Sequence, residues 1–319
     1  MRFVFVAGVI LAVGKFVAYF LTHSNAILSD AMESIINVVA GAIATFGVSF
    51  AAKPKDEDHP YGHGKIEFLS AGAEGGLIFL AGLYIIYKGV LSFFETPEFQ
   101  NLDIGLILTA AAGSINFLLG GLLLREGRKH HSAILIADGK HLLTDTITSI
   151  GVVAGVLLVY ITGYAWLDSL TAILFALYIL YTGYKLVQEA TVTLLDKADY
   201  AKLKELVELF KENRREKWID IHNLRTQKYG TDLHVDCHIT LPWYDTLEES
   251  HKEVDHLRDM VQENMKYDVE FFIHADPCVP PKSCEVCMLK ECPVRRAPFV
   301  KKIDWNLETL LPNQKHTAE

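Results

Sequence analysis

Six long apolar segments in the N-terminal part of the chain limit what it can fold into. Each is about 20 residues or longer, which is the length that an α-helix needs to cross the hydrocarbon core of a bilayer. Half of all residues are hydrophobic and the mean hydropathy is positive, as expected for a membrane protein. We therefore predict membrane helices at about residues 3–22, 27–50, 68–91, 104–124, 133–160 and 166–187.

The composition changes sharply after Asp196, and residues 198–319 are rich in charge and poor in long apolar runs. This part has the size of one soluble domain. Residues 232–241 alternate apolar and polar side chains, which is typical of a half-buried strand. The other expected elements are helices at 201–213 and 246–265 and strands at 219–229 and 268–275. We predict a transmembrane domain at 1–197, a soluble domain at 198–277, and a cysteine-containing tail at 278–319.

The second expected helix of this domain, 246–265, has an apolar stripe with one histidine on it. Leu247, Val254, Leu257 and Val261 recur at helical spacing and should face the core. His251 lies on the same stripe, so it is either a satisfied core residue or a metal ligand.

The basic residues of the loops predict the orientation of the chain. The loops at 51–67 and 125–132 each carry three Lys or Arg residues, whereas the loops at 22–26, 92–103 and 161–168 carry none. The positive-inside rule then places both termini and the soluble domain in the cytoplasm. The first segment lacks a small-residue cleavage site, so we interpret it as a membrane helix and not as a signal peptide. A net charge of −9 argues against nucleic acid as a partner.

Two short segments inside the apolar part, residues 29–37 and 137–145, resemble each other. Each places two metal-capable side chains one helical turn apart, Glu33 with Asn37 and His141 with Asp145. Ionisable groups inside a bilayer are costly and usually mark a pathway or a site. Two acids and two neutral donors suit one divalent cation. The alternative is hydrogen bonding between helices.

Three further acids in the apolar part have a plainer interpretation. Asp30 and Asp138 stand three residues before the first member of each pair. We interpret both as polar residues near a helix end, with a role beside the metal or in an aqueous vestibule as the alternative. Glu74 lies among glycines that allow close helix contact, and we expect it to hold helices together.

A second group of potential ligands lies in the loop that follows the second apolar segment. Asp56, His59 and His63 offer one carboxylate and two imidazoles, with Pro60 between them to break any helix. Such donors are ordinary zinc ligands. A solvated charged loop is the alternative.

Four of the five cysteines cluster near the C-terminus, at Cys278, Cys284, Cys287 and Cys292. In the cytoplasm disulfides are not expected. The spacing suits a structural Zn²⁺ site or an iron–sulfur cluster, and free thiols or a disordered tail are the alternatives. Cys237 lies on the apolar side of its strand and should be a core residue.

The six segments, the sequence His-Pro-Tyr-Gly-His-Gly-Lys-Ile-Glu at 59–67 and the repeated turn at 137–145 resemble the cation diffusion facilitator family of divalent metal transporters. The resemblance covers residues 1–277. It implies a homodimer with six helices per subunit and a cytoplasmic domain with a metallochaperone-like αββαβ fold. It also implies export of a metal from the cytoplasm in exchange for protons.

Carried over by position, the resemblance assigns the transport site to Glu33, Asn37, His141 and Asp145. The Glu-x-x-x-Asn half departs from the family pattern, which usually has His or Asp first and Asp second. One imidazole with three oxygen donors tolerates Mn²⁺ or Fe²⁺ better relative to Zn²⁺ than two imidazoles would. The resemblance also implies a loop site, an inter-subunit charge interlock and a cytoplasmic site. The loop site consists of Asp56, His59 and His63, and the charge interlock consists of Lys65 and Asp196. The cytoplasmic site consists of His222, His238, His251, His274 and Asp276. His234 shares the strand face of His238 and is an additional candidate.

These observations predict a secondary transporter that exports a divalent cation, Zn²⁺ first and Fe²⁺ or Mn²⁺ as alternatives, from the cytoplasm of a bacterial cell across its inner membrane. The sequence has no Walker-type glycine run, so we expect no nucleotide cofactor and no enzymatic activity. The expected partners are the metal, protons, membrane lipid and a second copy of the chain. The alternative function is a metal-responsive membrane scaffold or sensor without transport.

Overall fold

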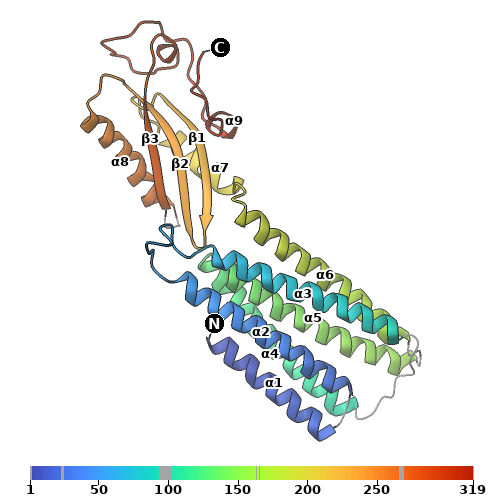
Figure 1. Cartoon of the computed structure of the whole chain (residues 1–319). Coiled ribbons are helices and arrows are strands. Elements are labelled where there is room, and N and C mark those ends of the chain that lie inside the picture. Colours follow the sequence, from blue (N-terminus) through green and yellow to red (C-terminus); the bar gives the residue numbers. More distant parts are fainter. Residues whose placement is uncertain are drawn as a thin grey trace. The chain divides into compact units, whose positions relative to one another are not determined.

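The computed structural model describes residues 2–22, 25–92, 102–162, 164, 166–265 and 269–318. The chain divides into two compact units, residues 1–195 and 196–319. The first unit is helical and the second contains a small sheet, as Figure 1 shows.

The described part of the first unit consists of long α-helices, each between 21 and 30 residues. By length and composition alone, residues Ile66–Leu91 could cross a membrane, and Val4–Gly14 and Asn37–Ala51 form shorter apolar stretches. The repeated turns place polar and ionisable side chains within two of the other helices. The helices are α1 (Arg2–Thr22), α2 (Asn25–Ala51), α3 (Ile66–Ser92), α4 (Leu102–Lys129), α5 (Ala133–Thr162) and α6 (Trp166–Leu194).

Close helix contacts at glycine fix the positions of α5 and α6. A Cβ on Gly183 of α6 would lie 2.6 Å from the backbone nitrogen of Phe79 in α3. A Cβ on Gly139 of α5 would lie 2.9 Å from the backbone nitrogen of Leu124 in α4. Both distances are shorter than any side chain tolerates, so only glycine permits these approaches. Gly139 belongs to the second repeated turn, and its contact therefore holds that turn against α4.

The second unit has the predicted order αββαβ. Its sheet has the strand order β1-β2-β3, with β1 antiparallel and β3 parallel to β2. Asp199 caps the first helix, and Thr246 with Glu249 forms a capping box at the second. The elements are α7 (Tyr200–Glu212), β1 (Asp220–Tyr229), β2 (Asp232–Leu241), α8 (Leu247–Asn264) and β3 (Val269–Pro277).

The predicted alternation of β2 builds the core of this unit. Val235, Cys237 and Ile239 are at most 2% exposed and belong to one cluster with apolar residues of α7 and α8. The prediction that Leu247 lies in this core is wrong, because its side chain is 88% exposed at the first turn of α8. Glu253 is buried instead, and its carboxylate accepts hydrogen bonds from Trp218 and Arg215.

Residues 278–318 pack onto the same core although they contain little regular structure. Their helices are the 3₁₀ helix η1 (Lys282–Glu285) and α9 (Leu307–Leu310), of four residues each. Trp305 is 1% exposed, and the guanidinium of Arg214 stacks 3.9 Å from the centre of its ring. Burial lowers the pKa of Arg214 to about 10, although Asp220 and Asp304 oppose that shift. The residues after β3 therefore belong to the folded second unit.

Candidate metal sites

Three of the four predicted transport residues meet between α2 and α5. The Asn37 side chain lies between the other two: its Nδ2 donates to Asp145 Oδ2 at 2.6 Å, and its Oδ1 lies 3.2 Å from His141 Nε2. His141 and Asp145 are 4% and 9% exposed. The helical spacing of four residues explains why both α5 side chains reach the same side chain of α2. The three groups form one polar cluster within a helical bundle.

Glu33 lies on α2 one turn before Asn37. Its side chain is outside the described residues, as is that of Asp30. The fourth ligand of the transport site therefore stays a prediction.

A cavity beside this cluster is lined by residues of α1, α2, α4 and α5. Asn37, His141 and Asp138 line it, together with Ser34 and Asn116, which we had not identified from the sequence. Asn116 is 7% exposed, and an amide within an apolar helix was a signal that could have found it. Asp138 is 3% exposed, and its Oδ2 has no hydrogen-bond partner in the described part of the chain. Asp138 thus lies in the cavity wall, five residues after the start of α5.

Glu74 of α3 is fully buried, and neither carboxylate oxygen has a hydrogen-bond partner among the residues that the structure describes. The neighbouring Gly75 does approach α6 closely, with its Cβ position 2.7 Å from Leu186 Cβ. The glycines thus make the predicted helix contact, whereas the Glu74 carboxylate forms no described hydrogen bond across it.

The loop between α2 and α3 brings its three predicted ligands together. One potential ligand atom from each of Asp56, His59 and His63 lies within 4.8 Å of the others. The Asp56 carboxylate is 3.1 Å from His59 Nδ1 and 3.4 Å from His63 Nε2. Desolvation tends to raise the pKa of Asp56, but hydrogen bonds from the backbone and side chain of His59, with the nearby imidazoles, together outweigh it and lower that pKa. The arrangement of two imidazoles around one carboxylate suits a zinc ion.

The second unit aligns three predicted histidines across its sheet. His222 of β1 pairs with His238 of β2, which in turn pairs with His274 of β3. Asp276 lies two residues after His274 and therefore on the same face. Its Oδ2 is 3.4 Å from His222 Nε2 and 3.1 Å from His238 Nδ1. His222, His238 and Asp276 form a cluster that could hold a metal ion, and His274 Nε2 lies 3.7 Å from the other Asp276 oxygen.

Three residues that sequence reasoning missed surround this cluster, and two of them come from the C-terminal segment. Lys315 Nζ lies 3.3 Å from Asp276 Oδ1. The Asp220 carboxylate contacts both His222 and His316. Desolvation tends to raise the pKa of both acids. The hydrogen bond with His238 together with the Lys315 ammonium outweighs it and lowers the pKa of Asp276, and hydrogen bonds with His222 and His316 do the same for Asp220. A carboxylate that orients a ligating histidine is a common outer partner at metal sites.

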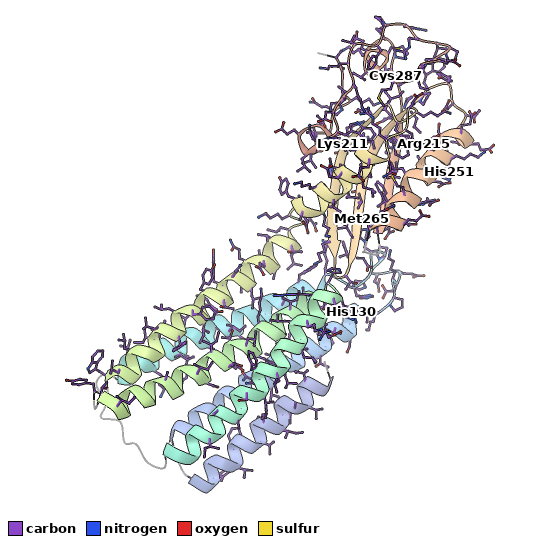
Figure 2. All side chains as sticks on the ribbon, turned by 180° about the vertical axis from the view of Figure 1, so that it is seen from behind. His130, Lys211, Arg215, His251, Met265 and Cys287 are labelled. Carbon is purple, nitrogen blue, oxygen red and sulfur yellow. The ribbon has the colours of Figure 1, made fainter. Side chains whose placement is uncertain are left out.

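The remaining predicted ligands of the second unit lie outside this cluster. His251 is on α8 (Figure 2), where its exposed imidazole contacts Asp255 one turn away. It is therefore not a core residue, and within one chain it does not join His222 and His238. His234 is buried and contacts Glu270 at 3.6 Å.

The two residues of the predicted charge interlock lie at helix ends. Lys65 directly precedes α3. Asp196 follows α6 with a φ of 56°, a left-handed conformation that ends the helix.

The four clustered cysteines line one cavity in the second unit, and all five cysteines of the chain are free thiols. Cys287, in the segment after β3 (Figure 2), is 4% exposed. Cys237 is buried in the core of the sheet, as predicted for its strand face.

Comparison with known proteins identifies the family. The family model for the cation efflux transmembrane domain matches residues 1–195, and the model for the cytoplasmic domain of cation efflux proteins matches residues 195–278. The chain belongs to the cation diffusion facilitator family. Its two units are therefore a transmembrane domain and a cytoplasmic domain, and the chain is an integral membrane transporter of metal cations rather than an enzyme.

Relatives of this cation diffusion facilitator occur in bacteria and plants. An uncharacterised transporter of Synechocystis sp. is 33% identical over 270 residues, which cover 84% of this chain and 86% of the relative. The cation-efflux pump FieF of Yersinia pestis is 28% identical over 282 residues, with 84% and 89% covered. Metal tolerance protein C1 of Arabidopsis thaliana is 28% identical over 299 residues, with 87% and 62% covered.

Proposed function

We propose that this protein exports a divalent metal cation from the cytoplasm in exchange for protons. The observation that carries the proposal is the buried contact of Asn37 with His141 and Asp145 between α2 and α5. A sensor whose function lay only in the cytoplasmic histidines would not need such a cluster within the transmembrane domain.

The charge of the site fits a divalent cation. Asp145 and Glu33 bring two carboxylates, while His141 and Asn37 bring neutral donors. A cation in a medium of low dielectric constant needs its charge balanced by its ligands. Four donors with two negative charges therefore suit a divalent ion in tetrahedral coordination.

Protons and metal compete for the same atoms. His141 Nε2 and the carboxylates bind the metal only when they are deprotonated, so binding of a proton opposes binding of the metal. A site that loads metal on the cytoplasmic side and protons on the other side would couple an inward proton gradient to export. Both termini and the second unit would then lie in the cytoplasm, and the membrane would be a bacterial inner membrane.

The donor set leaves the choice of metal to experiment, with Zn²⁺ as our first proposal. His141 with Asp145 is the usual zinc-type pair, whereas Glu33 with Asn37 adds oxygen donors that Fe²⁺ and Mn²⁺ accept more readily. The relative FieF is described as a cation-efflux pump, which supports export without naming the metal.

We further propose that the protein acts as a homodimer whose arrangement responds to metal at the loop and cytoplasmic sites. The match of the second unit to a cation efflux cytoplasmic domain supports this assembly. His251 is exposed and so is accessible to a second subunit. Lys65 and Asp196 would form the charge interlock between subunits. Metal that binds one arrangement more tightly would favour that arrangement.

Purified protein in proteoliposomes tests the proposed function. We expect a metal-sensitive dye inside the vesicles to report uptake of Zn²⁺ that accelerates when the interior is made acidic. Dissipating the pH gradient with an ionophore should abolish the acceleration. Metal binding without flux at any pH gradient would instead favour the scaffold or sensor.

The contact of Lys315 with Asp276 makes a separate prediction about the cytoplasmic site. The ammonium group and a bound metal compete for the same carboxylate, so Lys315→Ala should tighten Zn²⁺ binding about 2- to 5-fold. Zn²⁺ affinity should be measured by calorimetric titration. The binding heat that is lost in His238→Ala identifies the contribution of the cytoplasmic site. Lys302→Ala, an exposed lysine of the same segment, is the matched control and should change nothing. Equal affinities for Lys315→Ala and the control would contradict the competition.

A further inference from the structure

The cysteine cluster lies at and beyond the end of the family match. The model of the cytoplasmic domain ends at residue 278, so Cys284, Cys287 and Cys292 lie outside it. The proposed transport mechanism uses none of the four. Their role has to follow from the structure of the C-terminal segment.

Three separate pieces of backbone bring the four cysteines to the wall of one cavity. Cys278 directly follows β3, and its N–H donates to Leu241 O at 2.9 Å, which fixes it beside the end of β2. Cys284 lies in η1 and Cys287 just after it, whereas Cys292 comes from the next loop. All four side chains line the same cavity together with Tyr244 and Arg295. In a segment with so little regular structure, four thiols are not expected to lie around one cavity by chance.

Hydrogen-bond donors lie close to one of the sulfurs and to the backbone that carries the cysteines. The backbone N–H of Arg296 points to Cys284 Sγ at 3.5 Å, and Tyr244 lines the same cavity as Cys292. The Arg295 guanidinium donates to the carbonyl oxygens of Cys284 and Cys287, at 2.9 and 3.2 Å. A divalent cation with four thiolates carries two negative charges in excess, and an adjacent guanidinium offsets one of them.

The C-terminal segment also needs a constraint that its own secondary structure does not supply. Residues 278–318 contain two helices of only four residues each, yet Val286, Trp305 and Leu310 are buried in the domain core. Ordering such a loop-rich stretch costs much conformational entropy. Small structures of this kind are commonly held by disulfides or by a structural metal, and these cysteines are free.

We propose that Cys278, Cys284, Cys287 and Cys292 bind a structural Zn²⁺ ion in tetrahedral coordination. The ion would join the C-terminal segment to the ends of β2 and β3. In the two histidine–carboxylate clusters the potential ligand atoms all lie within 4.8 Å of one another. Among the described residues, no three of the four sulfurs do so. Binding therefore requires side-chain rotations that draw the four sulfurs around the ion. This role is structural and does not depend on the proposed transport.

X-ray absorption on the full-length, detergent-purified protein tests the site directly. After Zn²⁺ loading and removal of weakly held metal, we expect about one Zn²⁺ per chain with a shell of four sulfurs at about 2.3 Å. The predicted ligands of the transport, loop and cytoplasmic sites are nitrogen and oxygen atoms, so only the cysteines can supply this signal. Zinc without sulfur neighbours, an iron–sulfur chromophore, or a mass that shows disulfides would each overturn the proposal.

Variants provide the matched comparison. Cys284→Ser combined with Cys287→Ser should lose the sulfur-bound zinc, whereas Cys237→Ser, which changes the core cysteine of β2, should keep it. In the wild-type protein, zinc should protect all four clustered cysteines from alkylation, and a strong chelator should remove the protection. This second measurement needs no altered protein, so misfolding of a variant cannot imitate it. Equal alkylation with and without zinc would contradict the site.

Discussion

Asp145→Ala should reduce metal flux in proteoliposomes at least about 100-fold. The Asp145 carboxylate accepts a 2.6 Å hydrogen bond from Asn37 and is 9% exposed, so it stands within the polar cluster of the transmembrane domain. Its removal leaves the cation with one negative charge fewer in a medium of low dielectric constant. Loss of groups that merely orient metal ligands already costs 10- to 100-fold in affinity, and loss of a ligand should cost no less.

Glu126→Gln is the matched control for this experiment, because it also neutralises an acid of the same domain. Glu126 lies near the end of α4, where its partly exposed carboxylate pairs with His130. We expect this variant to transport like the wild type. Both variants should elute from a sizing column as the wild type does. If correctly folded Asp145→Ala transports as fast as wild type, the proposed site is in the wrong place.

Asn37→Asp should change which metal is transported, raising the flux of Zn²⁺ relative to Mn²⁺ about 5- to 10-fold. The substitution replaces an amide that donates to Asp145 and faces His141 with a carboxylate. A carboxylate is a stronger donor than an amide oxygen, and stronger donors enlarge the differences in affinity between Mn²⁺ and Zn²⁺. The flux of Zn²⁺, Mn²⁺, Fe²⁺, Co²⁺ and Cd²⁺ should be measured for wild type and variant under one pH gradient.

Asn116→Asp separates the effect of a carboxylate ligand at residue 37 from the effect of added negative charge alone. Asn116 lines the same cavity from α4, so the control adds an equal charge nearby without altering the contacts of His141 and Asp145. We expect the control to leave the ratio of Zn²⁺ to Mn²⁺ flux unchanged. An unchanged ratio in Asn37→Asp would count against Asn37 as a ligand, and equal changes in both variants would assign the effect to charge.

Local sequence patterns were sufficient to predict the helices and strands of the cytoplasmic domain. The alternation of Val235, Cys237 and Ile239 predicted both the strand and its buried face, because side chains of a strand point alternately to opposite sides. The same reasoning failed at the start of α8, where Leu247 is exposed. Helical spacing identifies a stripe but does not say how far along the helix the core extends, and only packing against the sheet decides that.

Local sequence patterns were enough to establish that the chain has a membrane part and a soluble part, and that two matched turns carry metal-capable side chains. These are properties of neighbouring residues, set by helical and strand periods. The distant groups that meet became known from the folded chain: Asn37 with His141 and Asp145, the histidine row of β1, β2 and β3, and Lys315 with Asp276. These contacts depend on the strand register, on helix contacts at glycine and on the path of the C-terminal segment. The spacing of residues that are close in sequence specifies none of the three.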